Sequence, residues 1–295
     1  MAGLGGLWIN NQMKILFIKQ KQEDYLGDSV YHGLKSVLGR DVVCSVDLDY
    51  MYSDYPKKSE LYGKGFTLFC NLDPSLKAVL SEEKIKESIK NKEYDYIFYG
   101  SISRCTEYLD LVKQYYPALK VVVFDGEDSP QLHLLAAEFI YFKREMVEKK
   151  YKNMYPISFS IPDEKIVKNL PLEKIKDFGA VVPGQNETYI FDNEEDYYKD
   201  YQESRFGVTL KKGGWDCMRH YEMLANGCLP YFLGLENCPE NTLHNFPKEL
   251  AKQAYGLVSN FDQEKYEDLQ SKLLEYTKNN LTTEACAKYI LEKIK

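Results

Sequence analysis

The sequence predicts an α/β protein whose two domains are each built on a parallel sheet. Short apolar runs typical of buried strands alternate with helical patterns in both halves of the chain. This alternation is typical of parallel sheets that carry helices on both faces. A length of 295 residues suggests about two domains. A hydrophobic fraction of 44% is enough for a core in each of them.

The first domain is expected to span residues 13–155. Its strand-like runs lie at residues 13–18, 41–46, 94–99 and 120–124, and its helical patterns lie at residues 30–38, 81–92 and 106–116. Ser81 is the expected N-cap of the second helix, because its hydroxyl can accept a hydrogen bond from the first turn. The loops that follow strands are candidate ligand sites, since such sheets bind ligands at the carboxyl ends of their strands. These loops are residues 19–28, 100–104 and 125–130.

The chain changes character over residues 138–176, where a basic stretch contains three prolines. This stretch is the best candidate for a domain boundary, so the second domain is expected to span residues 156–295. Its strands are expected at residues 178–182, 207–210 and 228–232, and its helices at residues 194–205, 216–226, 263–279 and 282–294. The last helix could pack back on the first domain. Lys143-Arg144-Glu145, near the boundary, is interpreted as a solvated run of charges, with the alternative that its basic pair reaches a phosphate.

Charge and cysteine content exclude several classes of function. A net charge of −7 repels phosphate backbones, so no nucleic-acid partner is expected. Seven cysteines without a CxxC pair indicate free thiols in a reducing compartment, and we expect a cytoplasmic protein. No apolar run approaches 18 residues, so no transmembrane segment is expected. Asp47-Leu48-Asp49 has the spacing of a metal-binding pair, but such pairs are frequent by chance, and no metal site is predicted.

Residues 211–227 combine several features of an anion site. The strand expected to end near Leu210 is followed by Lys-Lys-Gly-Gly at 211–214, and a helix is expected to open at about Asp216. Glycine lets the backbone approach a ligand closely. A helix N-terminus offers unpaired N–H groups and a partial positive charge, so this arrangement suits a phosphate or diphosphate. The plainer alternative is an ordinary Gly-Gly turn before a helix.

Two charged residues of the expected helix extend this site. Arg219 and Glu222 are three residues apart and share one helix face. Arg219 could add to the anion site, and the Glu222 carboxylate could accept hydrogen bonds from a ribose diol. The alternative is a solvated surface pair, which contributes only a few tenths of a kcal/mol. His220 lies beside them and is expected to be a hydrogen-bonded structural histidine, while residues 183–186 could meet a nucleotide base.

The string Glu222-Met-Leu-Ala-Asn-Gly227, followed by Cys-Leu-Pro-Tyr-Phe232, resembles the signature of GT-B glycosyltransferases. The fuller string, with Gly-Trp-Asp and Arg219, is similar to the group-1-like and exostosin-like transferases. The resemblance implies two Rossmann-like parallel-sheet domains that face a cleft, with a nucleoside diphosphate sugar as donor and no required metal or other cofactor. In the family, the glutamate holds the ribose and nearby basic groups hold the diphosphate. The predicted donor-binding residues are therefore Lys211, Lys212, Gly213, Gly214, Arg219 and Glu222.

One departure from the family pattern bears on the mechanism. Many retaining members carry a second glutamate eight positions before the first, and Gly214 stands at that position here. The sequence therefore favours an inverting transfer. Such a transfer needs a base within hydrogen-bond reach of the acceptor hydroxyl, and the first domain would supply it across the cleft.

The predicted catalytic residues are Asp125, Glu127 and Asp128, which follow the strongest strand of the first domain. Three carboxylates at one strand end repel each other, and this repulsion favours proton uptake by at least one of them. The alternative is a solvated turn in which Asp128 or Ser129 caps the next helix. Other candidate bases follow the first strand. They are Asp24, Asp28 and His32.

The predicted function is transfer of a sugar from a nucleoside diphosphate donor to a hydroxyl of a glycan, a lipid-linked acceptor or a protein. Two alternatives stay open. One is a non-catalytic GT-B-like module that binds a sugar nucleotide or a glycan, and the other is an epimerase on the same fold. Release of free nucleoside diphosphate would distinguish the transferase from the binding module.

Overall fold

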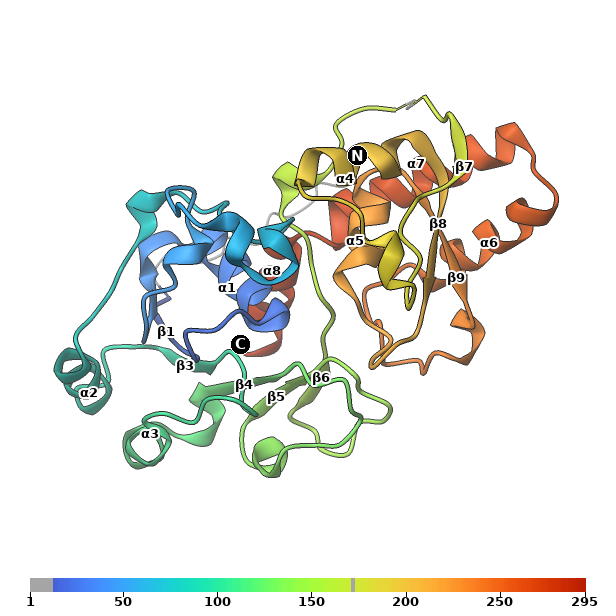
Figure 1. Cartoon of the computed structure of the whole chain (residues 1–295). Helices are drawn as coiled ribbons and strands as arrows, with labels where there is room; N and C mark the ends of the chain where they lie inside the picture. The colour runs from blue at the N-terminus through green and yellow to red at the C-terminus, as the bar shows by residue number, and fades with distance from the viewer. Residues whose placement is uncertain (1–12, 171–172) are drawn as a thin grey trace, which may run out of the picture.

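The computed structural model describes residues 13–170 and 173–295, which form two parallel sheets (Figure 1). The first sheet has six strands in the order β2-β1-β3-β4-β5-β6, and the second has three in the order β7-β8-β9. All neighbouring strands are parallel. The predicted α/β architecture is therefore confirmed.

The strands of the first sheet are β1 (Ile15–Ile18), β2 (Val42–Cys44), β3 (Tyr96–Tyr99), β4 (Val121–Asp125), β5 (Ile140–Lys143) and β6 (Met154–Pro156). Those of the second are β7 (Lys176–Phe178), β8 (Ser204–Leu210) and β9 (Leu229–Leu233). The helices are α1 (Tyr25–Leu38), α2 (Glu82–Lys90), α3 (Leu109–Tyr115), α4 (Glu194–Glu203), α5 (Met218–Ala225), α6 (Lys248–Ser259), α7 (Gln263–Asn280) and α8 (Thr283–Lys293).

The first sheet is buried on both faces, because its central strands are apolar at successive positions rather than at alternate ones, except for Asp125 at the end of β4. Successive side chains of a strand point to opposite faces. One face carries a row of phenylalanines, and the rings of Phe124 and Phe142 lie 5.3 Å apart. Helices α1 and α8 cover this face, and α2 and α3 cover the other. Strand β1 pairs with β2 on one side and β3 on the other, so the order in which strands are added to the sheet reverses at β1.

The last helix lies on the first sheet's side of the molecule, against α1 (Figure 1). Gly33 of α1 allows this contact, because a Cβ there would lie 1.9 Å from the backbone oxygen of Thr283. The Tyr96 hydroxyl donates to the backbone oxygen of Ile294 at 2.7 Å. We call the first sheet with α1, α2, α3 and α8 the first lobe, and the second sheet with α4 to α7 the second lobe. The chain therefore crosses between the lobes twice, after β6 and before α8.

Several elements differ from expectation. Strands β5 and β6 and helix α6 were not predicted, and β7 ends at Phe178, where a strand was expected to begin. Lys143 and Arg144 belong to the core rather than to a solvated charge run, since their side chains are 0% and 2% exposed. Their charges are compensated there, because Lys143 pairs with Asp125 at the end of β4 and Arg144 pairs with Asp128 of the loop that follows. Ser81 caps α2 as expected, and its hydroxyl accepts from the N–H of Lys84.

Among the described residues, no helix combines the length and the apolar character that a membrane crossing requires.

Candidate functional site

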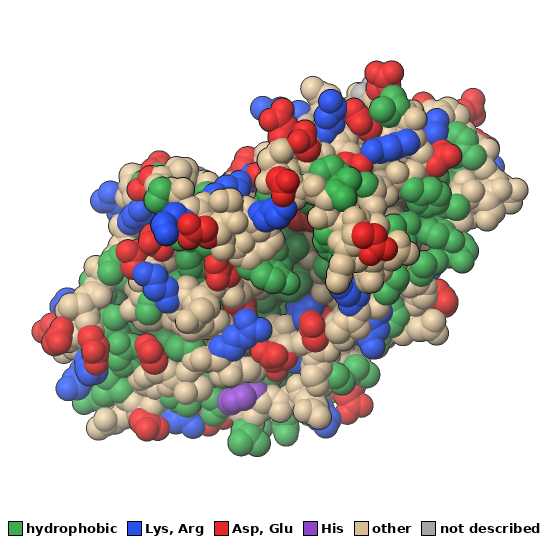
Figure 2. Space-filling model, viewed as in Figure 1, with side chains coloured by type: hydrophobic (Ala, Val, Ile, Leu, Met, Phe, Trp, Pro, Cys, Tyr) green, Lys and Arg blue, Asp and Glu red, His purple; other side chains and the backbone are tan. Residues whose placement is uncertain are grey.

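A cleft of about 850 Å³ lies between the lobes, and the space-filling view shows the surface hollowed there (Figure 2). The first lobe contributes loops from the carboxyl ends of β1, β3 and β4, which is the edge where such sheets bind ligands. The second lobe contributes the loop after β8 and the start of α5. Charged residues of the first lobe that line the cleft are Glu23, Asp24, Arg104, Glu127, Asp128 and Arg144. Second-lobe lining residues include Asn186, Tyr189, Lys212, Gly213, Gly214, Cys217 and Arg219.

The basic residues of the predicted donor segment have no carboxylate partner in the described part of the chain. The ammonium of Lys211 lies over the ring of Trp215 at 5.7 Å, and Arg219 contacts Tyr189 through its hydroxyl at 2.8 Å and its ring at 5.3 Å. Lys212 makes no ion pair within these residues, and its side chain is exposed. Three uncompensated cations in an acidic chain of net charge −7 indicate a site for an anion.

The helix itself opens later than the sequence predicted. Helix α5 begins at Met218 rather than near Asp216, and its N-cap residue Cys217 makes no side-chain capping hydrogen bond. The first turn therefore keeps N–H groups that a ligand could use. Met218 and Arg219 of this turn both line the cleft.

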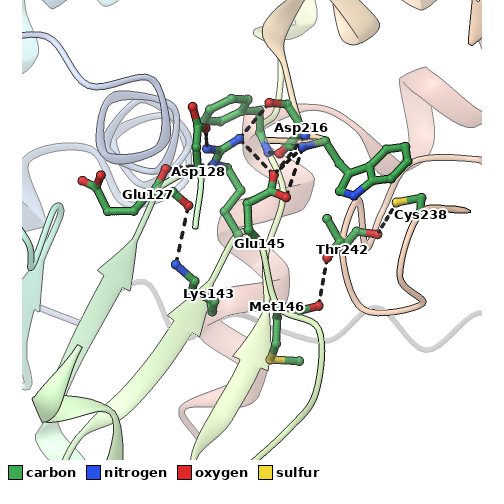
Figure 3. A network of polar contacts seen from close by, with 12 residues as sticks. Glu127, Asp128, Lys143, Glu145, Met146, Asp216, Cys238 and Thr242 are labelled. Carbon is green, nitrogen blue, oxygen red and sulfur yellow. Dashed lines mark hydrogen bonds and ion pairs between the residues drawn. The ribbon is translucent and has the colours of Figure 1, made fainter. Parts of the chain in front are cut away.

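The late start has a specific cause, which lies in the first lobe. The Glu145 carboxylate, directly after β5, accepts hydrogen bonds from the backbone N–H groups of Trp215 and Asp216, both at 3.0 Å (Figure 3). A Cβ at position 214 would lie 2.6 Å from Glu145 Oε1, and one at position 213 would collide with Asp128. The glycines thus admit two carboxylates of the other lobe at the place where the sequence predicted a phosphate.

Arg144 is the centre of this interlobe network. Its guanidinium pairs with Asp128 and, at 3.3 Å, with Glu145, and it donates to the backbone oxygen of Asp216 at 2.7 Å. It also lies over the ring of Phe159 at 4.6 Å. Burial raises the pKa of Asp216 to about 6, although the positive charge of Arg144 acts in the opposite direction. The network joins the lobes at one side of the cleft.

Glu222 lies in a smaller pocket of about 320 Å³ that continues from the cleft. Its carboxylate is 7% exposed, and it accepts hydrogen bonds from the hydroxyls of Thr67 and Tyr197, the latter at 2.6 Å. Burial raises its pKa, while these hydrogen bonds lower it. The pocket and the cleft share walls at Tyr189 and Arg219. The walls of the pocket are mostly aromatic, with Tyr25 and Tyr62 shared with the cleft and Phe66, Phe191 and Tyr197 belonging to the pocket.

The acidic turn after β4 does not hold three mutually repelling carboxylates. Asp125 is 2% exposed, pairs with Lys143 at 2.9 Å and does not line the cleft. Asp128 pairs with Arg144. Glu127 lines the cleft, is 42% exposed, and lies 3.4 Å from the guanidinium of Arg104. Each carboxylate has its own cation, so the turn is not the uncompensated acidic cluster that the sequence predicted.

The alternative role of the turn as a helix cap is wrong, since the next helical element is a short 3₁₀ turn that His133 caps. Of the other candidate bases, Asp24 lines the cleft but caps α1 and pairs with Arg104 at 3.0 Å. Asp28 is completely buried and pairs with Lys19 at 2.7 Å. His32 is buried against Thr283 at 2.9 Å.

Glu23 is a cleft carboxylate that the sequence analysis missed. It makes no hydrogen bond or ion pair within the described residues, and it lies in the loop between β1 and α1. The available signal was its place after the first strand, where three neighbouring residues were already candidates.

His220 is buried, as expected of a structural histidine, but neither ring nitrogen has a partner in the described chain. Burial lowers its pKa to about 3, so the ring is neutral.

Within residues 13–170 and 173–295, no group of three or more His, Cys, Asp or Glu side chains could hold a metal ion. The Asp47-x-Asp49 pair belongs to no such group.

Comparison with solved structures identifies related folds. HepE of Anabaena in complex with UDP is similar with a TM-score of 0.54 and 11% identity, over 96% of this chain and 99% of that chain. The same protein in complex with UDP and glucose gives a TM-score of 0.52 and 10% identity over the same shares. MurG of Acinetobacter baumannii gives a TM-score of 0.40 and 9% identity. No protein-family model and no curated protein matches the chain.

The likeness to HepE extends over nearly the whole of both chains, and it agrees with two parallel-sheet lobes that face a cleft. This likeness supports the fold and not membership of the exostosin-like group in particular. The chain has the GT-B fold.

Proposed function

We propose that this chain is a glycosyltransferase that moves a sugar from a nucleoside diphosphate donor to an acceptor hydroxyl, with inversion and without a bound metal. The observation that carries the proposal is the anion site of the second lobe. Lys212, Arg219 and the uncapped start of α5 border the cleft without a carboxylate partner in the described chain, and Glu222 lies one turn further. HepE, which has the same fold, was solved with UDP and glucose, and this supports a nucleotide-sugar donor.

The donor diphosphate would lie against the first turn of α5, with Arg219 and Lys212 beside it. The positive side chains and the helix N-terminus would stabilise the charge that develops on the leaving diphosphate. Glu222 would accept hydrogen bonds from the ribose, and the nucleobase of the donor would enter the aromatic pocket of about 320 Å³. The transferred sugar would then point into the larger cleft, toward the loops of the first lobe.

Glu127 is the proposed base. Glu127 and Asp128 both line the cleft and are exposed, but Asp128 is held by Arg144, whereas the one ion pair of Glu127, to Arg104, is long at 3.4 Å. It would take the proton of the acceptor hydroxyl while the hydroxyl oxygen attacks the anomeric carbon. The bond from that carbon to the diphosphate oxygen would break, and the nucleoside diphosphate would leave. Gly214, in place of a second glutamate, supports inversion over retention.

The acceptor could be a glycan, a lipid-linked sugar or a protein, since the cleft offers room beyond the donor pocket. We place the reaction in the cytoplasm, because all seven cysteines are free thiols, which suits a reducing compartment.

The test is a panel of nucleoside diphosphate sugars incubated with the purified protein, beginning with UDP-glucose. We expect slow release of free nucleoside diphosphate from one donor, faster release with the right acceptor, and a product whose anomeric configuration is opposite to the donor's. The proposal fails if no donor of the panel is either bound or consumed. Product with retained configuration would contradict the inverting mechanism alone.

A second candidate function is a binding module without transfer. One observation favours it: the Glu222 carboxylate and the N–H groups of Trp215 and Asp216 are all engaged within the protein. Such a module would gain thermal stability from a donor but release no nucleoside diphosphate in any acceptor mixture. An epimerase would instead convert the donor sugar with no acceptor present.

A further inference from the structure

Residues 61–68 of the first lobe, which we call the wall segment, reach across to the second lobe beside Glu222. Gly63, Lys64 and Phe66 line the same pocket as Glu222 and Tyr197. The pocket proposed for the nucleoside is thus not made by the second lobe alone.

Three kinds of contact hold the wall segment in place. The Lys64 ammonium donates to the backbone oxygen of Phe191 at 2.7 Å and pairs with Asp192 at 2.6 Å. The ring of Phe66 stacks on that of Tyr197, with centroids 5.7 Å apart. An ion pair, a hydrogen bond to the backbone and ring stacking therefore hold the wall segment against the second lobe at Lys64 and at Phe66.

Thr67 uses all its polar groups at this junction. Its hydroxyl donates to Glu222 and accepts from the Tyr198 hydroxyl at 2.7 Å. Its backbone N–H donates to Glu194, and its carbonyl accepts from Asn71 at 2.7 Å. Burial raises the pKa of Tyr198 well above its usual value, so the phenol keeps the proton that it donates. The single proton of the Thr67 hydroxyl is therefore directed at the Glu222 carboxylate.

The backbone of the wall segment is strained at Thr67. Its φ is +68°, a conformation that a β-branched residue rarely adopts, and Lys64 nearby has φ +55°. Residues held in such conformations are concentrated at functional sites, including ligand clamps. The four hydrogen bonds of Thr67 hold it in this unfavourable conformation. Since one of them goes to Glu222, the conformation indicates a function at that carboxylate.

We propose that Thr67 is a positioning residue for nucleoside recognition, through which the first lobe orients the ribose-binding carboxylate of the second. This inference rests on the proposed function. A carboxylate offers about four acceptor positions, and the Thr67 and Tyr197 hydroxyls use one on each oxygen of Glu222. The others are free for a ribose diol. The pocket stays open at about 320 Å³ while the Thr67 bond is made, so the contact orients Glu222 without filling its site.

The arrangement couples the donor pocket to the contact between the lobes. Thr67 and Phe66 come from the first lobe, whereas Tyr197, the other hydrogen-bond partner of Glu222, comes from the second. The orientation of Glu222 therefore depends on how the wall segment packs against the second lobe.

The experiment measures binding of UDP, GDP, ADP, CDP and inorganic pyrophosphate to the full chain by titration calorimetry. Thr67→Val removes the hydroxyl at nearly constant volume. We expect it to weaken the best-bound nucleoside diphosphate about tenfold, because it removes a hydrogen bond to a charged group. Pyrophosphate has no ribose, so its affinity should stay within about twofold, a split that a general loss of structure would not produce.

Two control variants complete the test. Thr67→Ser keeps the hydroxyl and should restore binding to within about twofold of the parent. Thr277→Val removes a similarly buried hydroxyl in α7, bonded to the Leu273 carbonyl at 2.7 Å, and should leave all affinities unchanged. Equal or tighter nucleotide binding by Thr67→Val would overturn the inference, and tighter binding would identify the wall segment as a competitor for Glu222. A parent chain that binds none of the four nucleotides would overturn the proposed function, and this inference with it.

Discussion

Two of the arginines that border the cleft, Arg144 and Arg219, lie in opposite electrostatic surroundings. Arg144 of the first lobe is 2% exposed and pairs with Asp128 and Glu145, while it also donates to two backbone oxygens. Arg219 of the second lobe touches a tyrosine and a thiol and has no carboxylate partner in the described chain. Its Nε–H is buried without any acceptor there.

The same difference separates the two regions to which these arginines belong. In the acidic turn, Asp125, Glu127 and Asp128 each face their own cation. In the donor segment, the cations have no such anion, and the carboxylate of the donor pocket, Glu222, has only neutral hydroxyl partners. A charge that is compensated within the protein contributes to the fold, whereas an uncompensated charge at a cleft is available to a ligand. The first region would therefore stabilise the molecule, and the second would bind the donor.

Glu127 has the weakest ion pair of the acidic turn, at 3.4 Å from Arg104, and it is the proposed base. Replacing it should therefore give the largest effect on activity. We expect Glu127→Gln to lower kcat by about 10²- to 10⁴-fold, the range for loss of a general base, with donor affinity unchanged. The measurement is the rate of nucleoside diphosphate release with saturating donor and acceptor.

Glu23→Gln is the matched control, because Glu23 lines the same cleft and makes no ion pair within the described residues. If this variant loses the activity and Glu127→Gln keeps it, Glu23 is the base and the assignment of the turn is wrong.

Arg144→Met tests the structural side of the comparison. It leaves Glu145 buried without its cation, and loss of one partner of a buried pair costs about 3 kcal/mol or more. We expect a loss of about that size in the free energy of unfolding, measured by urea denaturation. Arg219→Met should change the same quantity by less than about 0.5 kcal/mol. Equal losses of unfolding free energy in the two variants would contradict the claim that Arg144 serves the fold and Arg219 the ligand.

Glu222→Gln tests the donor side. A neutral amide is a weaker acceptor for a ribose diol, so we expect affinity for a nucleoside diphosphate to fall about tenfold, which is about 1.4 kcal/mol. The free energy of unfolding at pH 7 should stay the same or increase slightly, because the substitution removes the charge of a buried carboxylate that has no cation partner. Isothermal titration and urea denaturation of one preparation measure both. A large loss of stability with unchanged nucleotide binding would assign Glu222 to the fold.

The smallest expected effect is a pH dependence at Asp216. Its pKa is about 6 in the folded protein, raised from 3.8, so the folded state binds more protons than the unfolded state between these values. The stability that this group contributes is full below pH 3.8 and is lost as the pH rises through about 6, by at most about 1.4 kcal/mol per pH unit. Urea denaturation at pH 5 and pH 7 should show a steeper decline for the parent than for Asp216→Asn. Identical slopes would contradict the raised pKa.

Much of the fold could be predicted because its signals are local. The apolar run 120–124 and the capped helix that follows Ser81 are readable without any knowledge of distant residues. Strand β5 could not be recognised, because its end reads Lys-Arg-Glu, and these charges are buried only through partners 16 to 71 residues away. The same long-range contact from Glu145 delays the start of α5.

The candidate site likewise has a part that the sequence could suggest and a part that it could not. The proposed donor segment is contiguous, so its basic residues and Glu222 could be proposed from spacing. Thr67 is 155 residues from Glu222, and no local pattern marks it as a partner. The acidic turn was located correctly at a strand end, but the cations that pair with its carboxylates come from the loop after β3, the end of β5 and the residue after β5, and they could not be assigned from the sequence.

The central claim is that uncompensated cations of the donor segment hold the donor diphosphate. Its most direct test is the melting temperature of the parent, Arg219→Met and Arg144→Met across a panel of nucleoside diphosphate sugars. A donor at a hundredfold excess over its Kd stabilises a protein by about 2.7 kcal/mol. We predict that at least one donor raises the melting temperature of the parent and of Arg144→Met, which begins lower, but not that of Arg219→Met. A donor that stabilises Arg219→Met as much as the parent would contradict the claim.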